Sequence, residues 1–208
     1  MINPVPTVYL VDDALSVRKG LERLIKSVGL NITTFASGEE FLRHKQYKQP
    51  SCLILDICLP GLSGMELHTK LIQENICLPI IFITGYGNIS MSVKAMKNGA
   101  VDFLQKPFND QEIISAINKA IDKSIRIQQE ADEHTKIQSM LDILTPREYE
   151  MLRWVITGML NKQIAFELNI TERTVKAHRS KIMKKMQVVS IVELFRITQK
   201  CGITPAEK

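Results

Sequence analysis

Five residues in the first half of this 208-residue chain are of the types that perform chemistry on phosphorus. They are Asp12, Asp13, Asp56, Thr84 and Lys106, and each lies at or just past the end of a short, largely apolar run. Carboxylates that lie close together repel one another unless a cation neutralises them, and such oxygen-rich groups suit Mg²⁺. A carboxylate beside the metal could act as a nucleophile toward phosphorus, while a hydroxyl and an ammonium would hold the phosphoryl oxygens. Taken singly, the same residues also occur in helix caps and turns.

Five β-prone runs have to bring these residues together. They cover residues 7–11, 31–35, 52–56, 79–84 and 101–104, and helical patterns separate them. This alternation predicts an α/β fold with a doubly wound, five-stranded parallel (βα)5 sheet that has helices on both faces. The carboxyl ends of such strands converge on one edge, where ligand chemistry takes place. The five residues are therefore expected to meet at that edge.

Helix-start signals support the alternation. Capping pairs at a spacing of three residues are Ser37 with Glu40, Ser63 with Glu66, and Asn109 with Glu112. An apolar stripe with helical spacing follows the first run and stops at Gly29. We assign residues 1–125 to this first domain.

The second half of the chain has only helical patterns. Thr145-Pro146-Arg147-Glu148 combines an N-cap, a proline at the first helical position and a capping-box glutamate. Further helices are expected over residues 161–168, 171–186 and 190–200, with a turn at Asn169-Ile170. We predict an all-α, four-helix domain over residues 143–208. Residues 126–142 are expected to form a helical extension and linker.

Charge differs between the two halves. Residues 1–144 carry 15 Lys and Arg against 16 Asp and Glu, whereas residues 145–208 carry 12 against 6. The C-terminal part therefore has a net charge of +6 and the rest has −1. A compact basic domain favours a polyanion as partner, although a generic basic surface would show the same bias.

The helix expected over residues 171–186 holds much of this charge. Six Lys or Arg and no acid lie between positions 173 and 185. At about 100° per residue, its apolar face holds Val175, Ile182 and Met186, and its polar face holds Arg173, Ala177, Ser180 and Lys184, flanked by Lys176 and Lys181. A short helix, a tight turn and this basic helix predict a helix-turn-helix that reads the major groove of DNA. A solvated basic helix is the alternative. Arg179 lies nearer the buried side, where it could pair internally or reach a phosphate.

The set Asp12-Asp13, Asp56, Thr84 and Lys106-Pro107 resembles the signature of bacterial response-regulator receiver domains, over about residues 5–125. The resemblance implies that Asp56 accepts a phosphoryl group from a phosphohistidine of a sensor histidine kinase. It also implies that Asp13, Asp56 and the backbone carbonyl of Cys58 ligate Mg²⁺, with Asp12 acting largely through water. Thr84 and Lys106 would bind the phosphoryl oxygens, and Phe103 would be the aromatic switch residue.

Two positions near the predicted phosphoacceptor are less usual for such a domain. Cys58 follows Asp56 by two residues, and Tyr86 follows Thr84 by two. In the family that the sequence resembles, these positions tune how fast the aspartyl phosphate hydrolyses. The lifetime of the phosphoryl group is therefore left open.

The C-terminal part resembles LuxR-type output domains. The residues that carry this resemblance are Leu144-Thr145-Pro146-Arg147-Glu148, Gly158, Asn161-Lys162, Ile164-Ala165, Leu168, Thr174-Val175-Lys176 and His178. Together with the receiver signature they resemble response regulators of the FixJ/NarL class. The resemblance implies that Lys176, Ala177 and Ser180 face base edges, and that Lys162, Arg173, Thr174 and Lys181 meet backbone phosphates.

The resemblance also implies a mechanism and partners. Phosphorylation would shift the population of states, with Thr84 and Phe103 repacking, and would favour a homodimer whose two recognition helices bind paired half-sites of promoter DNA. RNA polymerase is a further candidate partner. The sequence leaves open whether the two domains are docked or separated before phosphorylation.

Other classes of protein fit the sequence less well. There is no apolar run of the roughly 18–20 residues that a membrane span needs, and the N-terminus lacks a signal-peptide pattern, so a cytoplasmic location is expected. The four cysteines lack metal-ligand spacing. An aspartate-nucleophile phosphatase commonly has a second acid where this chain has Cys58, so we do not expect an enzyme beyond the receiver's own phosphorylation and dephosphorylation. A DNA-binding protein that ignores phosphorylation is the second alternative, against which the complete set of five residues argues.

Overall fold

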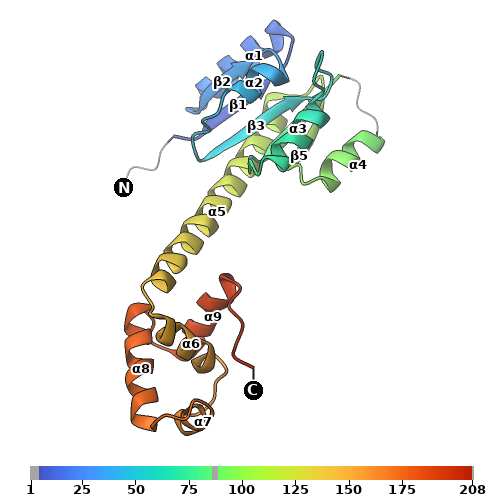
Figure 1. Cartoon of the computed structure of the whole chain (residues 1–208). Helices are drawn as coiled ribbons and strands as arrows, with labels where there is room; N and C mark the ends of the chain where they lie inside the picture. Colours follow the sequence, from blue (N-terminus) through green and yellow to red (C-terminus); the bar gives the residue numbers. More distant parts are fainter. Residues whose placement is uncertain (1–4, 86–88, 208) are drawn as a thin grey trace. The chain divides into compact units, whose positions relative to one another are not determined.

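The computed structural model describes residues 5–85 and 89–207, and its two units cover residues 1–129 and 130–208 (Figure 1). Each unit is described by itself. The first is an α/β unit built on a parallel sheet, and in the described residues of the second all regular secondary structure is helical. The predicted fold class is confirmed.

The sheet of the first unit has the strand order β2-β1-β3-β4-β5, and every pairing is parallel. The strands are β1 (Thr7–Val11), β2 (Asn31–Phe35), β3 (Ser51–Asp56), β4 (Ile80–Thr84) and β5 (Asp102–Gln105). The three central strands are buried along their whole length, whereas the edge strands β2 and β5 are partly exposed. Central strands of a parallel sheet are covered on both faces, which explains their unbroken apolar sequences.

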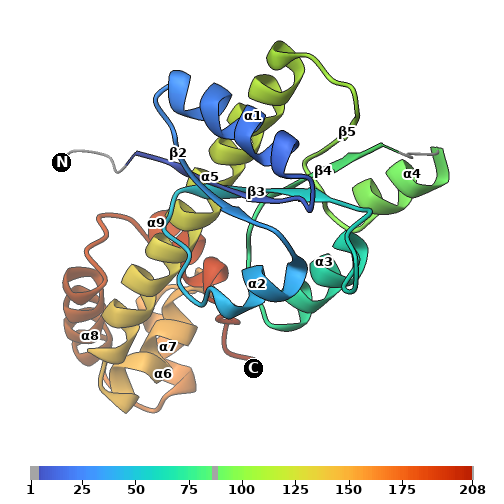
Figure 2. The ribbon, with the colours of Figure 1, turned by 90° about the horizontal axis from the view of Figure 1, so that it is seen from above.

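Helices cover both faces of this sheet. They are α1 (Leu15–Ser27), α2 (Gly38–Arg43), α3 (Gly64–Gln73), α4 (Ile89–Lys97) and the first part of α5 (Asp110–Asp142). Viewed from above, α1 and α5 lie on one side of the sheet, and α2 and α3 lie on the other (Figure 2). One buried cluster joins the sheet to α1 and α5, and a second joins it to α2, α3 and α4. Because the helices cover the two faces, the carboxyl ends of the strands come together at one edge of the sheet.

The predicted helix starts are largely as expected. Ser63 with Glu66 and Asn109 with Glu112 form reciprocal capping bonds. The Ser37 hydroxyl accepts from the amide of Glu40, but the Glu40 carboxylate accepts from Ala36, so this pair is only half of a capping box.

The second unit contains the four predicted helices. They are α6 (Pro146–Val155), α7 (Asn161–Glu167), α8 (Glu172–Lys185) and α9 (Ile191–Lys200). Thr145 and Glu148 form the predicted capping box at the start of α6. Asn169, in the predicted turn between α7 and α8, has a positive φ of 50°, a conformation that asparagine tolerates better than most residues.

Helix α5 continues into the second unit. Its residues 128–136 are exposed, but Ile137, Met140 and Leu141 are buried in the core that α6 to α9 share. The predicted boundaries at 125/126 and 142/143 stay predictions, and the last turns of α5 belong to the C-terminal core. Across residues 5–85 and 89–207, no helix has both the length and the apolar content that crossing a membrane requires.

Candidate functional site

Parallel pairing brings the predicted acidic residues together. Val11 is opposite Leu55 in the β1–β3 register, so Asp12 and Asp56, the next residues along, emerge side by side. Carboxylate oxygens of Asp12, Asp13 and Asp56 all lie within 4.8 Å of one another. Asp12 is fully buried and Asp56 is 5% exposed, whereas Asp13 faces solvent.

The Lys106 ammonium lies between two of these carboxylates. Its Nζ donates to Asp12 Oδ2 at 2.6 Å and to Asp56 Oδ2 at 2.6 Å. Burial raises the pKa of Asp12, against the opposing effect of hydrogen bonds from Lys106 and from the Ala14 amide. Burial also works to lower the pKa of Lys106, but its hydrogen bonds to Asp12 and Asp56 outweigh that effect and raise it. The lysine therefore stays charged and partly neutralises the pocket.

Asp56 is oriented by the loop that follows it. The amide of Cys58 donates to Asp56 Oδ1 at 2.9 Å, so both carboxylate oxygens have a partner. Gly64, the first residue of α3, packs closely against the end of β3, because a Cβ atom at this position would lie 2.2 Å from the Asp56 carbonyl oxygen. The missing side chain allows α3 to approach the end of β3.

Thr84 and Phe103 occupy neighbouring strands at the same edge. Thr84 ends β4 and is fully buried, and its Oγ1 lies 3.6 Å from the Cys58 Sγ. Phe103, on β5, is half-buried, is paired in register with Phe82 and packs against the cluster beneath α2, α3 and α4. Tyr86, which we expected to tune phosphoryl lifetime, lies outside the described residues.

The donor set fits a hard divalent cation. Three carboxylates whose oxygens lie within 4.8 Å of one another give the oxygen-only coordination that Mg²⁺ takes with one or two carboxylates and several waters. The exposed position of Asp13 leaves room for those waters. The acidic cluster can therefore hold a metal.

Arg18, on α1, also contacts this site and was not singled out from the sequence. Its guanidinium donates to the backbone carbonyls of Asp12 and Asp13. The sequence gives one indication of this contact: Arg18 is a cation in the first turn of a helix, a position where acids are favoured.

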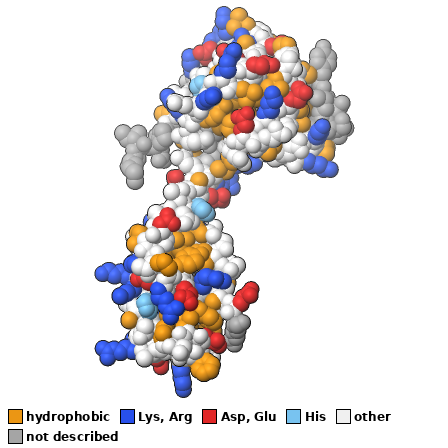
Figure 3. Space-filling model, in the orientation of Figure 1, with side chains coloured by type: hydrophobic (Ala, Val, Ile, Leu, Met, Phe, Trp, Pro, Cys, Tyr) orange, Lys and Arg blue, Asp and Glu red, His pale blue; other side chains and the backbone are white. Residues whose placement is uncertain are grey.

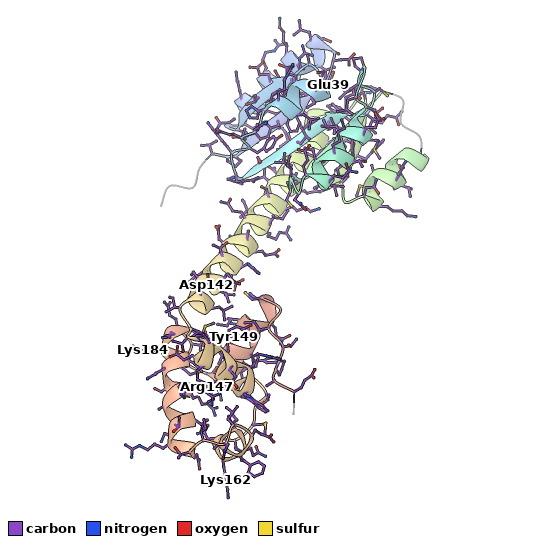
Figure 4. All side chains as sticks on the ribbon, viewed as in Figure 1. Glu39, Asp142, Arg147, Tyr149, Lys162 and Lys184 are labelled. Atoms are coloured by element: carbon purple, nitrogen blue, oxygen red, sulfur yellow. The ribbon has the colours of Figure 1, made fainter. Side chains whose placement is uncertain are left out.

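In the second unit, α8 has the predicted division into a buried and a basic face. Val175 and Ile182 are fully buried and Met186 is 1% exposed. The exposed residues include Arg173, Lys176, Ala177, Ser180, Lys181 and Lys184. Lys and Arg side chains project from the side of the unit that α8 forms (Figure 3). Lys184 on α8 and the exposed Lys162 on α7 both point away from the body of the unit (Figure 4).

Three polar residues of α8 take part in contacts within the unit instead. Arg179 donates to Asn161 Oδ1 at 2.8 Å, the internal pairing that was one of its two predicted roles. Lys185 Nζ bonds Glu148 Oε2 at 2.6 Å and the Ile143 carbonyl at 3.2 Å, which turns it away from the exposed face. Thr174 is half-buried, and its hydroxyl lies 2.8 Å from that of the N-cap Thr171.

The Glu148–Lys185 pair could not be read from sequence. Glu148 was predicted only as a capping residue, but it is 5% exposed and its bond to Lys185, with the Thr145 amide, lowers its pKa to about 2. Lys185 is 37 positions away, so no local pattern indicates the contact.

A doubly wound sheet with an acidic pocket at its carboxyl edge, joined to a helix-turn-helix with a basic exposed helix, defines a transcriptional response regulator. The family model described as the response regulator receiver domain matches residues 8–118. The model of bacterial regulatory proteins of the luxR family matches residues 142–198.

Relatives extend over almost the whole chain. Nodulation protein W of Bradyrhizobium diazoefficiens is 44% identical over 197 residues, covering 95% of this chain and 87% of that protein. The transcriptional regulatory protein FixJ of Rhizobium meliloti is 38% identical, covering 96% and 98%. The solved structure of the response regulator StyR aligns with a TM-score of 0.83 and 42% identity, covering 95% of this chain and all of that one. The chain belongs to the two-component response regulators that combine a receiver domain with a LuxR-type DNA-binding domain, and not to a typical enzyme family.

Proposed function

We propose that Asp56 is the phosphoacceptor, that a sensor histidine kinase is the donor, and that phosphorylation controls sequence-specific DNA binding by α8. The observation that supports this most strongly is the convergence of Asp12, Asp13 and Asp56 around the Lys106 ammonium, with Lys106 2.6 Å from two of the carboxylates. Cations that pair with a carboxylate in the resting site can also pair with phosphoryl oxygens.

The transfer is a displacement at phosphorus. A carboxylate oxygen of Asp56 attacks the phosphorus of a phosphohistidine, the P–N bond breaks, and its electron pair leaves with the imidazole. Lys106 then exchanges its bond to Asp56 for one to a phosphoryl oxygen. The Thr84 hydroxyl, now beside the Cys58 thiol, would donate to a second phosphoryl oxygen.

Mg²⁺ is the proposed cofactor. Asp13 and Asp56 would bind it directly with the Cys58 carbonyl, and Asp12 would bind through water. When bound, the ion supplies charge neutralisation for the phosphoryl oxygens.

The switch would run through Thr84 and Phe103. Movement of Thr84 toward the phosphoryl group vacates space at the end of β4, into which Phe103 of the adjacent strand can turn. This repacking would change the surface of α4 and β5 and favour a homodimer. The receiver would also assist hydrolysis of its own aspartyl phosphate, at a rate that Cys58 and Tyr86 tune.

The exposed face of α8 would enter the major groove. Lys176, Ala177 and Ser180 are the proposed base-edge residues, and Lys162, Arg173, Thr174 and Lys181 the proposed phosphate contacts. All of these are exposed except Thr174, which is half-buried and supports the proposal least. We also propose receiver, linker and DNA-binding segments over residues 1–125, 126–142 and 143–208, a cytoplasmic location, and RNA polymerase as a further partner.

The test uses the full-length protein, acetyl phosphate as donor and Mg²⁺. Intact mass before and after acid or hydroxylamine treatment should reveal one labile phosphoryl group, which Asp56→Asn abolishes. Asp102→Asn is the matched control, because Asp102, on β5, pairs with Lys119 of α5 and lies outside the acidic cluster. An equal adduct on Asp56→Asn would disprove the phosphoacceptor assignment. Selection from a random pool of DNA duplexes should then identify a preferred site. The phosphorylated protein should bind this site more tightly than the unphosphorylated protein does.

A further inference from the structure

The loop that carries Asp12 and Asp13 is fastened from α1 by one side chain. Nη1 of Arg18 donates to the Asp12 carbonyl at 2.5 Å and to the Asp13 carbonyl at 2.9 Å. One guanidinium nitrogen therefore holds two successive peptide groups, and these connect the end of β1 to the start of α1.

Helix stability does not account for Arg18 at this position. It lies in the first turn of α1, Leu15-Ser16-Val17-Arg18, which contains no acid. A cation at a helix N-terminus opposes the helix dipole, which favours negative charge there. The N-cap Ala14 has no polar side chain to hold the turn. The stabilising contacts that Arg18 makes from this position are its hydrogen bonds to the two carbonyls.

The two aspartates depend on these contacts to different degrees. Asp12 is also held by its own side chain, which accepts from the Ala14 amide at 2.9 Å and from Lys106 at 2.6 Å. Within residues 5–85 and 89–207, the Asp13 carboxylate has no hydrogen-bond partner, and it is exposed. The position of the Asp13 carboxylate therefore depends on the position of the Asp13 backbone. Arg18 holds that backbone through its hydrogen bond to the Asp13 carbonyl.

Arg18 has two opposing effects on a cation at this site. As a positive charge bonded to the backbone of Asp12 and Asp13, it repels the cation. As a donor that fixes the Asp12–Asp13 backbone, it holds the carboxylates in place and favours the cation. Groups that orient metal ligands from outside typically change metal affinity about 10- to 100-fold when they are removed. Arg18 is only half-buried, so salt and solvent weaken the repulsion that its charge exerts.

We propose that Arg18 is a positioning residue for the divalent-cation site. It orients Asp12 and Asp13 by holding their backbone carbonyls. The proposal rests on the proposed function, because it takes Asp12, Asp13 and Asp56 as the metal site. It makes hydrogen-bonding geometry, and not charge, the property that position 18 supplies.

The experiment measures Mg²⁺ binding to the full-length protein by isothermal titration calorimetry in the absence of a phosphodonor. Arg18→Lys keeps the charge but has a shorter side chain, whose ammonium ends short of the position of Nη1 that bonds both carbonyls. Arg18→Met loses both the charge and the donor. We expect both variants to bind Mg²⁺ about tenfold more weakly than the unaltered protein. Lys19→Met is the matched control, since Lys19 is the next residue of α1, is exposed and has no contact with the acidic cluster; its affinity should be unchanged.

Each other outcome has a defined meaning. Unchanged binding in Arg18→Lys overturns the proposal, whatever the result for Arg18→Met. Tighter binding in Arg18→Met would then assign the residue a purely electrostatic effect. If Arg18→Met does not fold by circular dichroism, Arg18→Lys alone decides. If the unaltered protein binds no Mg²⁺ and takes no phosphoryl group on Asp56, the proposed function itself fails, which is distinct from failure of the Arg18 assignment.

Discussion

The acidic pocket of the first unit and the basic face of α8 use charge in opposite ways. In the pocket, carboxylates and an ammonium are largely buried and paired at 2.6 Å. On α8, cations such as Lys176 and Lys181 lie exposed. Buried charges interact strongly and only in a defined geometry, whereas exposed charges act through a field that salt weakens. The pocket should therefore be sensitive to small displacements, and the basic face to charge and ionic strength.

The largest expected effect comes from displacing the backbone beside Asp56. Gly64→Ala introduces a Cβ atom that would lie 2.2 Å from the Asp56 carbonyl oxygen, so α3 must move away from β3. We expect the free energy of unfolding of the first unit to fall by about 3 kcal/mol, and phosphorylation by acetyl phosphate to slow. Chemical denaturation followed by circular dichroism measures the first effect.

Gly20→Ala is its matched control. Gly20 lies within α1, and a Cβ atom there would have no neighbour within 4 Å among the described residues. Alanine should stabilise the helix by roughly 0.5–1 kcal/mol. Similar destabilisation by both substitutions would show that close packing beside Asp56 is not the cause.

The next effect concerns sequence recognition by α8. If Lys176 contacts a base edge, Lys176→Ala should cost about 2 kcal/mol on the selected DNA site and lose discrimination at one base pair. Competition between the selected duplex and its single-base variants measures this. Equal losses on all duplexes would instead make Lys176 a phosphate contact.

The ion pair between Lys185 and the buried Glu148, behind the basic face, predicts a pH effect. The hydrogen bond from Lys185 lowers the pKa of Glu148 from 4.5 to about 2. Ionised Glu148 therefore stabilises the folded state fully above about pH 4.5, and this stabilisation is lost as the pH falls toward 2. We expect this contribution to be about 1–2 kcal/mol, since solvent screens part of it. Glu148→Gln keeps a capping side chain but should flatten the decline in stability between those pH values.

Trp154 provides the measurement. It is the only tryptophan of the chain and packs against the core of the second unit, so its fluorescence follows unfolding of that unit. Glu150→Gln is the control, because Glu150 pairs with Arg147 on the exposed surface. An identical acid dependence in Glu148→Gln and the unaltered protein would contradict the role of the buried pair.

The smallest and most general effect is expected at an exposed cation. Lys181→Ala should weaken binding to all DNA sequences alike and reduce the slope of log affinity against log salt by about 1. Lys185→Ala should leave that slope unchanged, because Lys185 is bonded to Glu148 and Ile143. Fluorescence anisotropy at several salt concentrations measures both slopes. Loss of discrimination with affinity intact in Lys181→Ala would contradict a phosphate contact.

Local sequence patterns were sufficient for most of the architecture. Capping at Ser63, Asn109 and Thr145 involves residues three positions apart, and each of these caps is formed. The apolar runs predicted the sheet because burial on both faces requires them. The apolar seam of α8 was also predictable, because helical periodicity alone determines which residues share a face.

The sequence by itself determined that the three aspartates lie at one sheet edge, and that a basic helix follows in a second unit. Only the tertiary structure decided which partner each of several charged side chains bonds. Lys106 bridges carboxylates 94 and 50 positions away, Lys185 turns inward to Glu148, and Arg18 reaches back to the Asp12 and Asp13 carbonyls. The physical reason is that periodicity and capping depend on neighbours three or four residues apart, whereas these contacts depend on the direction that each side chain takes once distant elements have packed.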